Sequence, residues 1–178
     1  MKLTLHRMAV DSFAPMMESF VAILDKAIAF EAAGGPDLVN ARLAPDMYGL
    51  AQQVQIFCQM AAGGVDRLTG RAPADREEPE TTLEGLKAQV ERTVARIRAV
   101  PAEAFAGAED RDCTFEIMDG MVLELDGEEL LRAWLLPHFY FHLVTAYDIL
   151  RSRGLEIGKI DYMSRLGLRI RQQDAAGG

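Results

Sequence analysis

Two of the three histidines in this chain, His138 and His142, stand four residues apart in a strongly apolar stretch. On a helix this spacing places both imidazoles on one face, with their Cβ atoms about 5–6 Å apart. Two rings in this arrangement can bind one divalent metal ion, because imidazole nitrogen is a common ligand of zinc. The pair therefore predicts a metal site, with Zn²⁺ or Ni²⁺ as the candidate ions.

The same pair is also compatible with a purely structural role. Histidines on a buried face must have their ring nitrogens satisfied, since an unpaired buried polar group costs about 1–3 kcal/mol. Carboxylates or backbone carbonyls can satisfy them as well as a metal ion can. Pro137 frees one carbonyl nearby, because a proline within a helix lacks the N–H that this carbonyl would accept. The spacing alone leaves both interpretations open.

A catalytic zinc site normally has three protein ligands and one open position, so the pair needs a third partner. Gln53 and Asp46, in the second predicted helix, are the candidates, although a neutral amide is a poorer ligand than a carboxylate. Cys58 would bind zinc well, but its apolar neighbours favour simple packing. His6 precedes the first predicted helix, which favours a surface position. The predicted metal residues are thus the two histidines, with Gln53 and Asp46 as the weaker candidates.

Apolar residues that recur every three or four positions indicate four long helices, which must position these side chains. The helices span about residues 13–33, 45–64, 81–100 and 126–153. Pro15 and Pro45 are expected in first turns, where the missing N–H is tolerated. Gly63 and Gly64 are expected to weaken the last turns of the second helix.

Capping residues mark where two of these helices begin. Thr81 and Glu84 have the spacing of a capping box, and Asp126 is a suitable N-cap for the last helix. The last helix is apolar on nearly every side, so we expect it to be the most buried element. Both histidines share one inward-facing stripe of this helix with four other residues: Leu131, Leu135, Thr145 and Ile149.

Between residues 114 and 125 the apolar residues alternate on either side of Asp119 and Gly120. This pattern predicts a short β-hairpin, because a tight hairpin turn needs positive φ at its central positions. The predicted fold class is therefore mainly all-α: a four-helix bundle with a β-hairpin inserted before the last long helix. We expect residues 1–162 to form a single domain and residues 163–178 a partly disordered tail.

The chain has 178 residues, of which 49% are hydrophobic and 26% charged, and this balance is typical of a folded globular protein. Its net charge of -8 opposes nucleic-acid binding, which depends on clustered Lys and Arg. No apolar stretch is long enough to cross a bilayer, so no membrane association is expected. Two cysteines are too few for a disulfide framework, which indicates a reducing compartment and a cytoplasmic location.

Several motifs resemble those of the DinB/YfiT-like helical-bundle superfamily of proposed metalloenzymes, and within it a bacterial branch of unknown function. The resemblance covers about residues 1–162. The motifs that carry it are LVNARLAPDM (38–47), QQVQI (52–56), AEDR (108–111), LPHFYFH (136–142) and TAY (145–147).

This resemblance implies a four-helix bundle that is commonly a homodimer, with a site between helices two and four. Metal-binding members take one histidine from helix two and a His-x-x-x-His pair from the last helix. His138 and His142 match that pair, whereas Gln53 stands at the helix-two position. Some members are thiol-dependent transferases or isomerases, but the motifs here do not select that activity.

Three functions follow, and whether the chain is an enzyme stays open. The first is metal-assisted hydrolysis or thiol or group transfer at His138 and His142. The second is binding of a small-molecule ligand without metal, in an apolar cleft lined by Trp134, Phe57 and Phe141. The third is a structural homodimer that keeps the architecture of a site but no chemistry.

Overall fold

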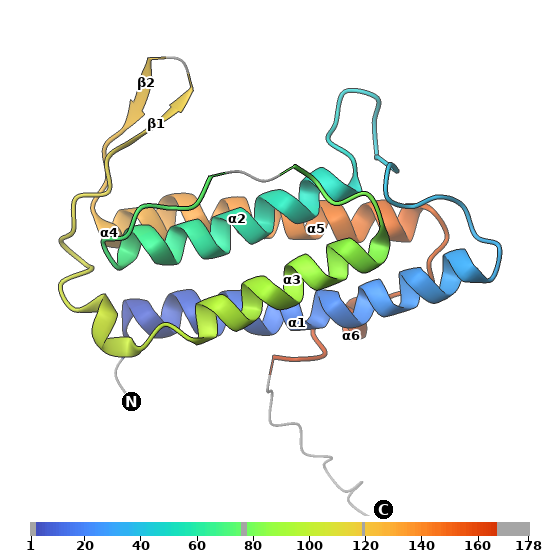
Figure 1. Ribbon diagram of the computed structural model, residues 1–178, viewed down its shortest axis with the longest axis horizontal. Coiled ribbons are helices and arrows are strands. Elements are labelled where there is room, and N and C mark those ends of the chain that lie inside the picture. Colours follow the sequence, from blue (N-terminus) through green and yellow to red (C-terminus); the bar gives the residue numbers. More distant parts are fainter. Residues whose placement is uncertain (1–2, 76–77, 119, 167–178) are drawn as a thin grey trace, which may run out of the picture.

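Four long helices lie in two layers and form a bundle in the computed structural model, which describes residues 3–75, 78–118 and 120–166. They are α1 (Leu5–Ala32), α2 (Leu50–Leu68), α3 (Leu83–Arg98) and α5 (Leu136–Ser152). Helix α2 packs mainly against α5 and α1 against α3, while α3 also contacts α2 (Figure 1). The prediction of a mainly α-helical bundle is confirmed. Most of the predicted tail, residues 167–178, lies outside the described residues.

Helix α1 begins earlier than the sequence pattern predicted. It starts at Leu5 and not at Phe13, because the Thr4 hydroxyl accepts a hydrogen bond from the backbone N–H of Arg7 (3.3 Å) and caps the helix. Pro15 consequently lies inside the helix and not in its first turn. The apolar stripe of α1 is longer by about two turns as a result.

Helix α2 begins later than predicted. Its first residue is Leu50, and Gly49 is the N-cap, with the Gln52 side chain accepting a hydrogen bond from the Gly49 N–H (3.1 Å). Pro45 and Asp46 therefore belong to the turns that precede the helix. A proline suits a first helical position, but here the local cap at Gly49 determines where the helix starts.

The two glycines do not end α2, which continues past them to Leu68. Gly64 instead permits close packing, because a Cβ atom at that position would lie 2.5 Å from Leu135 Cδ1. Gly63 is less restricted, since its nearest neighbour would be Pro73 Cβ at 3.5 Å. The lack of a side chain at Gly64 therefore brings α2 close to the last helical segment.

Helix α3 is capped one residue later than predicted. The Thr82 hydroxyl, and not that of Thr81, accepts a hydrogen bond from the Gly85 N–H (3.0 Å). Glu84 still lies in the first turn, where its charge favours the helix dipole. A short 3-10 helix, η1 (Ala102–Phe105), follows Pro101.

The predicted hairpin is confirmed. Strands β1 (Phe115–Met118) and β2 (Met121–Leu123) pair in antiparallel fashion, with Phe115 opposite Leu123. Gly120 has the positive φ (74°) that the turn requires, while Asp119 lies outside the described residues. The hairpin stands out from the end of the bundle where α4 begins (Figure 1).

The last long helix combines three segments: α4 (Gly127–Glu129), the π-helical η2 (Leu130–Leu135) and α5. Asp126 caps it as predicted, because its carboxylate accepts a hydrogen bond from the Glu129 N–H (2.8 Å). The wider π turn ends just before Pro137, and there the Leu136 N–H donates to the carbonyl of Leu131. This widening accommodates a proline that would otherwise press against the carbonyl four residues earlier.

The predicted inward stripe of this helix is buried at Leu131, Leu135, Thr145 and Ile149. We expected the last helix to be the most buried element of the bundle. This is wrong for its outer side, because Phe141 and Val144 are exposed. After α5 the chain packs back through buried Leu155 and Ile157 into a short helix, α6 (Lys159–Tyr162). None of the helices in the described part of the chain combines the length and apolar character that a bilayer-spanning segment requires.

Candidate functional site

The candidate site lies along the seam between α2 and α5, which run in opposite directions. Gln53 on α2 faces His142 on α5, and Gly64 near the other end of α2 contacts Leu135. Gln53 is 2% exposed, so its amide is enclosed between the two helices. The structure thus brings together three of the four residues predicted for the site: Gln53, His142 and, one turn away, His138.

A short hydrogen bond orients the His142 ring. Its Nδ1 atom lies 2.6 Å from Gln53 Oε1, and the Nε2 amide of Gln53 donates to the backbone carbonyl of Tyr48 (3.2 Å). A reversed amide would place two carbonyl oxygens against each other, so the amide orientation is fixed and its oxygen must face the ring. His142 therefore carries its proton on Nδ1, which leaves the lone pair on Nε2 free.

His138 is held differently. Its ring packs edge-on against Trp134 (centroids 4.1 Å apart), and its centroid lies 6.0 Å from that of His142. The Nδ1 atom of His138 is buried and has no hydrogen-bond partner among the described residues. A buried ring nitrogen without a partner costs free energy unless a ligand satisfies it.

Burial keeps both imidazoles neutral at pH 7. It lowers the pKa of His142 to about 4, with a smaller contribution from the neighbouring His138. Burial also lowers the pKa of His138 from its ordinary value of 6.5. Neutral imidazole is the form that binds metal ions, so neither ring needs to lose a proton to act as a ligand.

The donor set fits a divalent metal ion in part. Two imidazoles on one tetrahedral zinc ion place their centroids roughly 5 Å apart, given Zn–N bonds of about 2.0–2.1 Å, and the centroids of these two rings lie 6.0 Å apart. The unpartnered Nδ1 atom of His138 and the free Nε2 lone pair of His142 are both available. In the described part of the chain, however, no cluster of three or more His, Cys, Asp or Glu side chains could hold an ion.

The other predicted ligands lie elsewhere. Asp46 is exposed in the loop before α2 and does not form a cluster with the histidines. His6 packs its ring against Phe105 (centroids 5.2 Å apart) in the first turn of α1. Cys58 is buried, and burial raises the pKa of its thiol to about 12, so it stays protonated at neutral pH.

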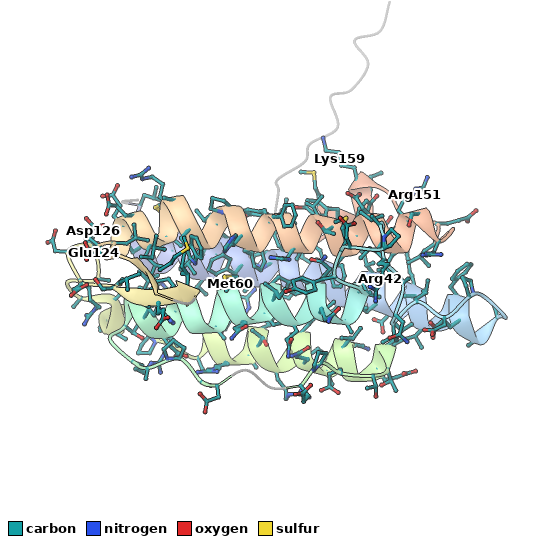
Figure 2. The ribbon with its side chains drawn as sticks, turned by 90° about the horizontal axis from the view of Figure 1, so that it is seen from above. Arg42, Met60, Glu124, Asp126, Arg151 and Lys159 are labelled. Carbon is teal, nitrogen blue, oxygen red and sulfur yellow. The ribbon has the colours of Figure 1, made fainter. Side chains whose placement is uncertain are left out.

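A cleft of about 730 Å³ opens next to His138. It is bounded by α2, by the segment 73–75, by strand β1 and by η2 together with the start of α5. Met60 marks its α2 side, facing the seam with α5 (Figure 2). Trp134 lines the cleft as the sequence predicted, and a volume of this size can hold a small organic molecule.

Two of the predicted lining residues are not part of this cleft. Phe57 is fully buried in the core, where its ring packs against Phe20 and Phe139. Phe141 is 58% exposed and points away from the bundle interior. Both residues are apolar, but the helical period does not distinguish a core residue from a cleft residue.

Arg67 and Phe115 line the cleft, and sequence reasoning missed both. The guanidinium carbon of Arg67 lies 4.2 Å from the centroid of the Phe115 ring, and Phe115 in turn packs edge-on against Trp134 (6.2 Å). A basic residue in the last turn of a helix and an aromatic residue in a hairpin are both common. Only the return of the hairpin over α2 brings them together.

Comparison with known proteins finds a family model and a similar solved structure. The model of a family described as "Domain of unknown function (DUF1993)" matches residues 5–163. A solved structure, the crystal structure of a DinB family member protein from Shewanella denitrificans, is 34% identical to this chain, with a TM-score of 0.83. The match covers 94% of this chain and 96% of that protein. No functionally curated protein matches the chain.

Proposed function

The chain belongs to the DUF1993 family and is a DinB family member, and from this premise we propose that His138 and His142 hold a divalent metal ion beside a bound small molecule. The observation that carries the proposal is the hydrogen bond between Gln53 and His142 (2.6 Å). It holds the ring with Nε2 unprotonated, which is how histidines that bind metals are commonly oriented by a carbonyl behind them.

Gln53 is in this proposal a positioning residue and not a metal ligand. Its oxygen already accepts the Nδ1 proton of His142, and its nitrogen already donates to Tyr48. The ion would therefore have two protein ligands, His138 and His142, and several open positions. A divalent ion bound there would supply Lewis-acid chemistry, which suits hydrolysis or transfer of a thiol or another group.

Two neighbouring features support a small molecule at this place. His138 belongs both to the histidine pair and to the lining of the 730 Å³ cleft. The Trp134 ring packs against the imidazole of His138, and Leu130 and Leu135 add apolar lining to the same cleft. A molecule in the cleft would thus lie next to the pair and could complete an otherwise two-ligand site.

Binding of a small molecule without a metal ion is the second candidate. It is favoured by the absence, in the part of the chain that the structure describes, of a third His, Cys, Asp or Glu beside the pair. In that case a donor on the ligand satisfies the unpartnered Nδ1 of His138. The cleft and the positioning of His142 by Gln53 are the same in both candidates.

Metal titration separates the two candidates. Untagged protein, stripped with a chelator, would be titrated with Zn²⁺ and Ni²⁺ against a coloured competitor. We expect the wild type to bind one ion per chain, and His138→Gln and His142→Gln to bind at least about tenfold more weakly. His6→Gln is the matched control, because His6 packs against Phe105 away from the pair. Equal binding by all four proteins would contradict the metal proposal and leave the second candidate.

We also propose that the chain forms a homodimer through apolar side chains on its surface. Helix α5 exposes Phe141 and Val144, and the loop before α2 exposes Leu43 and Tyr48. Contiguous exposed apolar patches mark interaction sites, and the partner we propose for these side chains is a second copy of the chain. Sedimentation should give a dimer for the wild type and a shift toward monomer for Phe141→Ser, and a monomeric wild type would overturn this proposal.

A further inference from the structure

Arg67 lines the cleft, and among the described residues it forms no ion pair with a carboxylate. It lies in the last turn of α2, half-buried, with its side chain over the ring of Phe115. The helix dipole explains why a positive charge is favourable at the C-terminus of α2. It does not explain why the guanidinium group is half-buried. Burial lowers the pKa of Arg67 from its usual value, although the group remains charged at pH 7.

The nearest acidic residue in the sequence cannot serve as its partner. Both carboxylate oxygens of Asp66 are occupied, one by Arg71 (3.3 Å) and the other by Arg96. Among the described residues no carboxylate forms an ion pair with Arg67. This guanidinium can therefore donate hydrogen bonds to an anion from outside the chain.

The acidic residues that line the cleft do not form ion pairs with Arg67 either. Asp75 and Glu116 line it as well, but both are exposed to solvent, and Glu116 accepts a hydrogen bond from the Gly120 N–H (2.9 Å). Within the described lining, Arg67 is the one lysine or arginine. The two acidic side chains disfavour a multiply charged anion such as phosphate more than a carboxylate with a single charge.

A row of aromatic rings connects Arg67 to the histidine pair. Phe115 lies beneath Arg67, Trp134 packs against Phe115, and His138 packs against Trp134. The cleft thus has a cation at one end, an apolar aromatic wall, and a neutral imidazole at the other end. An arginine fork is the side chain best suited to bind a carboxylate with two hydrogen bonds.

We propose that the cleft binds a small carboxylate with an apolar or aromatic body, the carboxylate on Arg67, the body along Trp134 and the opposite end at His138. The inference rests on the proposed function only in placing the functional site at this cleft. It requires no metal ion on the histidines.

Solution NMR can test this with a matched pair of probes, phenylacetate and its neutral analogue phenylacetamide. The indole Nε1–H of Trp134 is an unambiguous reporter, because the chain has a single tryptophan. We expect phenylacetate to shift this signal in a saturable manner and phenylacetamide to bind at least about tenfold more weakly. Inorganic phosphate should shift it little at the same concentration. Equal binding of the two probes, or tighter binding of phosphate, would overturn the proposal.

Variants of Arg67 provide the second arm. Arg67→Gln should reduce phenylacetate binding by about tenfold or more, and Arg67→Lys should give an intermediate loss because it keeps the charge but not the fork. Arg151→Gln is the matched control, since Arg151 is exposed near the other end of α5 (Figure 2). If Arg67→Gln binds as well as the wild type while remaining folded by circular dichroism, the assignment of Arg67 is wrong.

The two proposals fail in different ways. Phenylacetate binding that survives chelation and His142→Gln, combined with no metal binding, would uphold the carboxylate site and reject the metal. Metal binding with no response to phenylacetate would do the reverse. A carboxylate that binds equally to wild type and Arg67→Gln would contradict the inference whatever the metal titration shows.

Discussion

Gln53 and His142 are joined across the seam between α2 and α5 by a hydrogen bond of 2.6 Å between Oε1 and Nδ1. Because the Gln53 nitrogen is fixed by the Tyr48 carbonyl, the amide cannot rotate without losing both contacts. The glutamine therefore sets the protonated nitrogen of the ring. This relationship gives several expectations about metal binding, stability and pH.

Gln53→His should strengthen metal binding. The substitution places a third imidazole on α2 opposite His142 and converts a positioning residue into a ligand. We expect the affinity for Zn²⁺ to rise by at least about tenfold in competition titrations. Ala51→His is the control, because a residue two positions earlier lies on a different side of α2, and it should change the affinity little. An unchanged affinity for Gln53→His would mean that position 53 does not face the ion.

Replacing the two histidines by phenylalanine should affect stability in opposite directions. His142→Phe removes the partner of the buried Gln53 oxygen, so we expect the free energy of unfolding to fall by about 1–3 kcal/mol. His138→Phe removes a buried nitrogen that has no partner and keeps a ring against Trp134, so stability should stay equal or rise. Urea unfolding in the presence of a chelator measures both, and equal losses would contradict the assigned contacts.

Much of the architecture follows from local sequence signals. The helical period predicts the four long helices, and the alternation around Asp119 and Gly120 predicts the hairpin. The spacing of His138 and His142 predicts that the rings are neighbours, and the position of Gln53 on its own helix predicts an inward amide. These features depend on residues within one or two turns of each other, where the period is informative.

The sequence-based predictions are wrong where a capping hydrogen bond or a contact between distant residues determines the structure. Helix α1 starts after Thr4 and α2 after Gly49, because hydrogen bonds at those caps outweigh the preferences of nearby prolines. Position 64 favours glycine because Leu135, from another helical segment, occupies the space that a side chain there would need. The contact of Arg67 with Phe115 depends on how the hairpin folds back, and no local pattern specifies that.

Lowering the pH should destabilise the metal-free protein through His142. Its folded pKa is about 4, whereas an unfolded histidine titrates near 6.5, so between these values only the unfolded state takes up the proton. The contribution of the neutral His142 ring to the free energy of unfolding is therefore at its full value above about pH 6.5, and it is lost as the pH falls toward 4. The difference in unfolding free energy between wild type and His142→Gln should shrink over this range. A constant difference between pH 7 and pH 4 would show that His142 titrates normally.

Asp66→Asn should destabilise the fold more than the loss of a surface ion pair. Asp66 is buried in α2 and holds Arg71 and Arg96, so the neutral amide leaves two guanidinium groups without their shared anion. We expect a loss of about 1–3 kcal/mol, less than for a fully buried pair because both arginines are partly exposed. Asp11→Asn, which breaks an exposed pair with Arg7, should have little effect in the same urea titration.

Gly64→Ala and Gly63→Ala should have opposite effects although the residues are neighbours in one helix. A methyl group at position 64 would lie 2.5 Å from Cδ1 of the buried Leu135 and force it to move, which we expect to cost about 1–3 kcal/mol. At position 63 the nearest atom is Pro73 Cβ at 3.5 Å, an ordinary contact, so the higher helix propensity of alanine should add up to about 1 kcal/mol. Urea midpoints at equal slope measure both changes. If the two substitutions have the same effect, α2 does not approach Leu135 closely. In that case the lack of a side chain at Gly64 does not determine where Leu135 lies in the wall of the cleft.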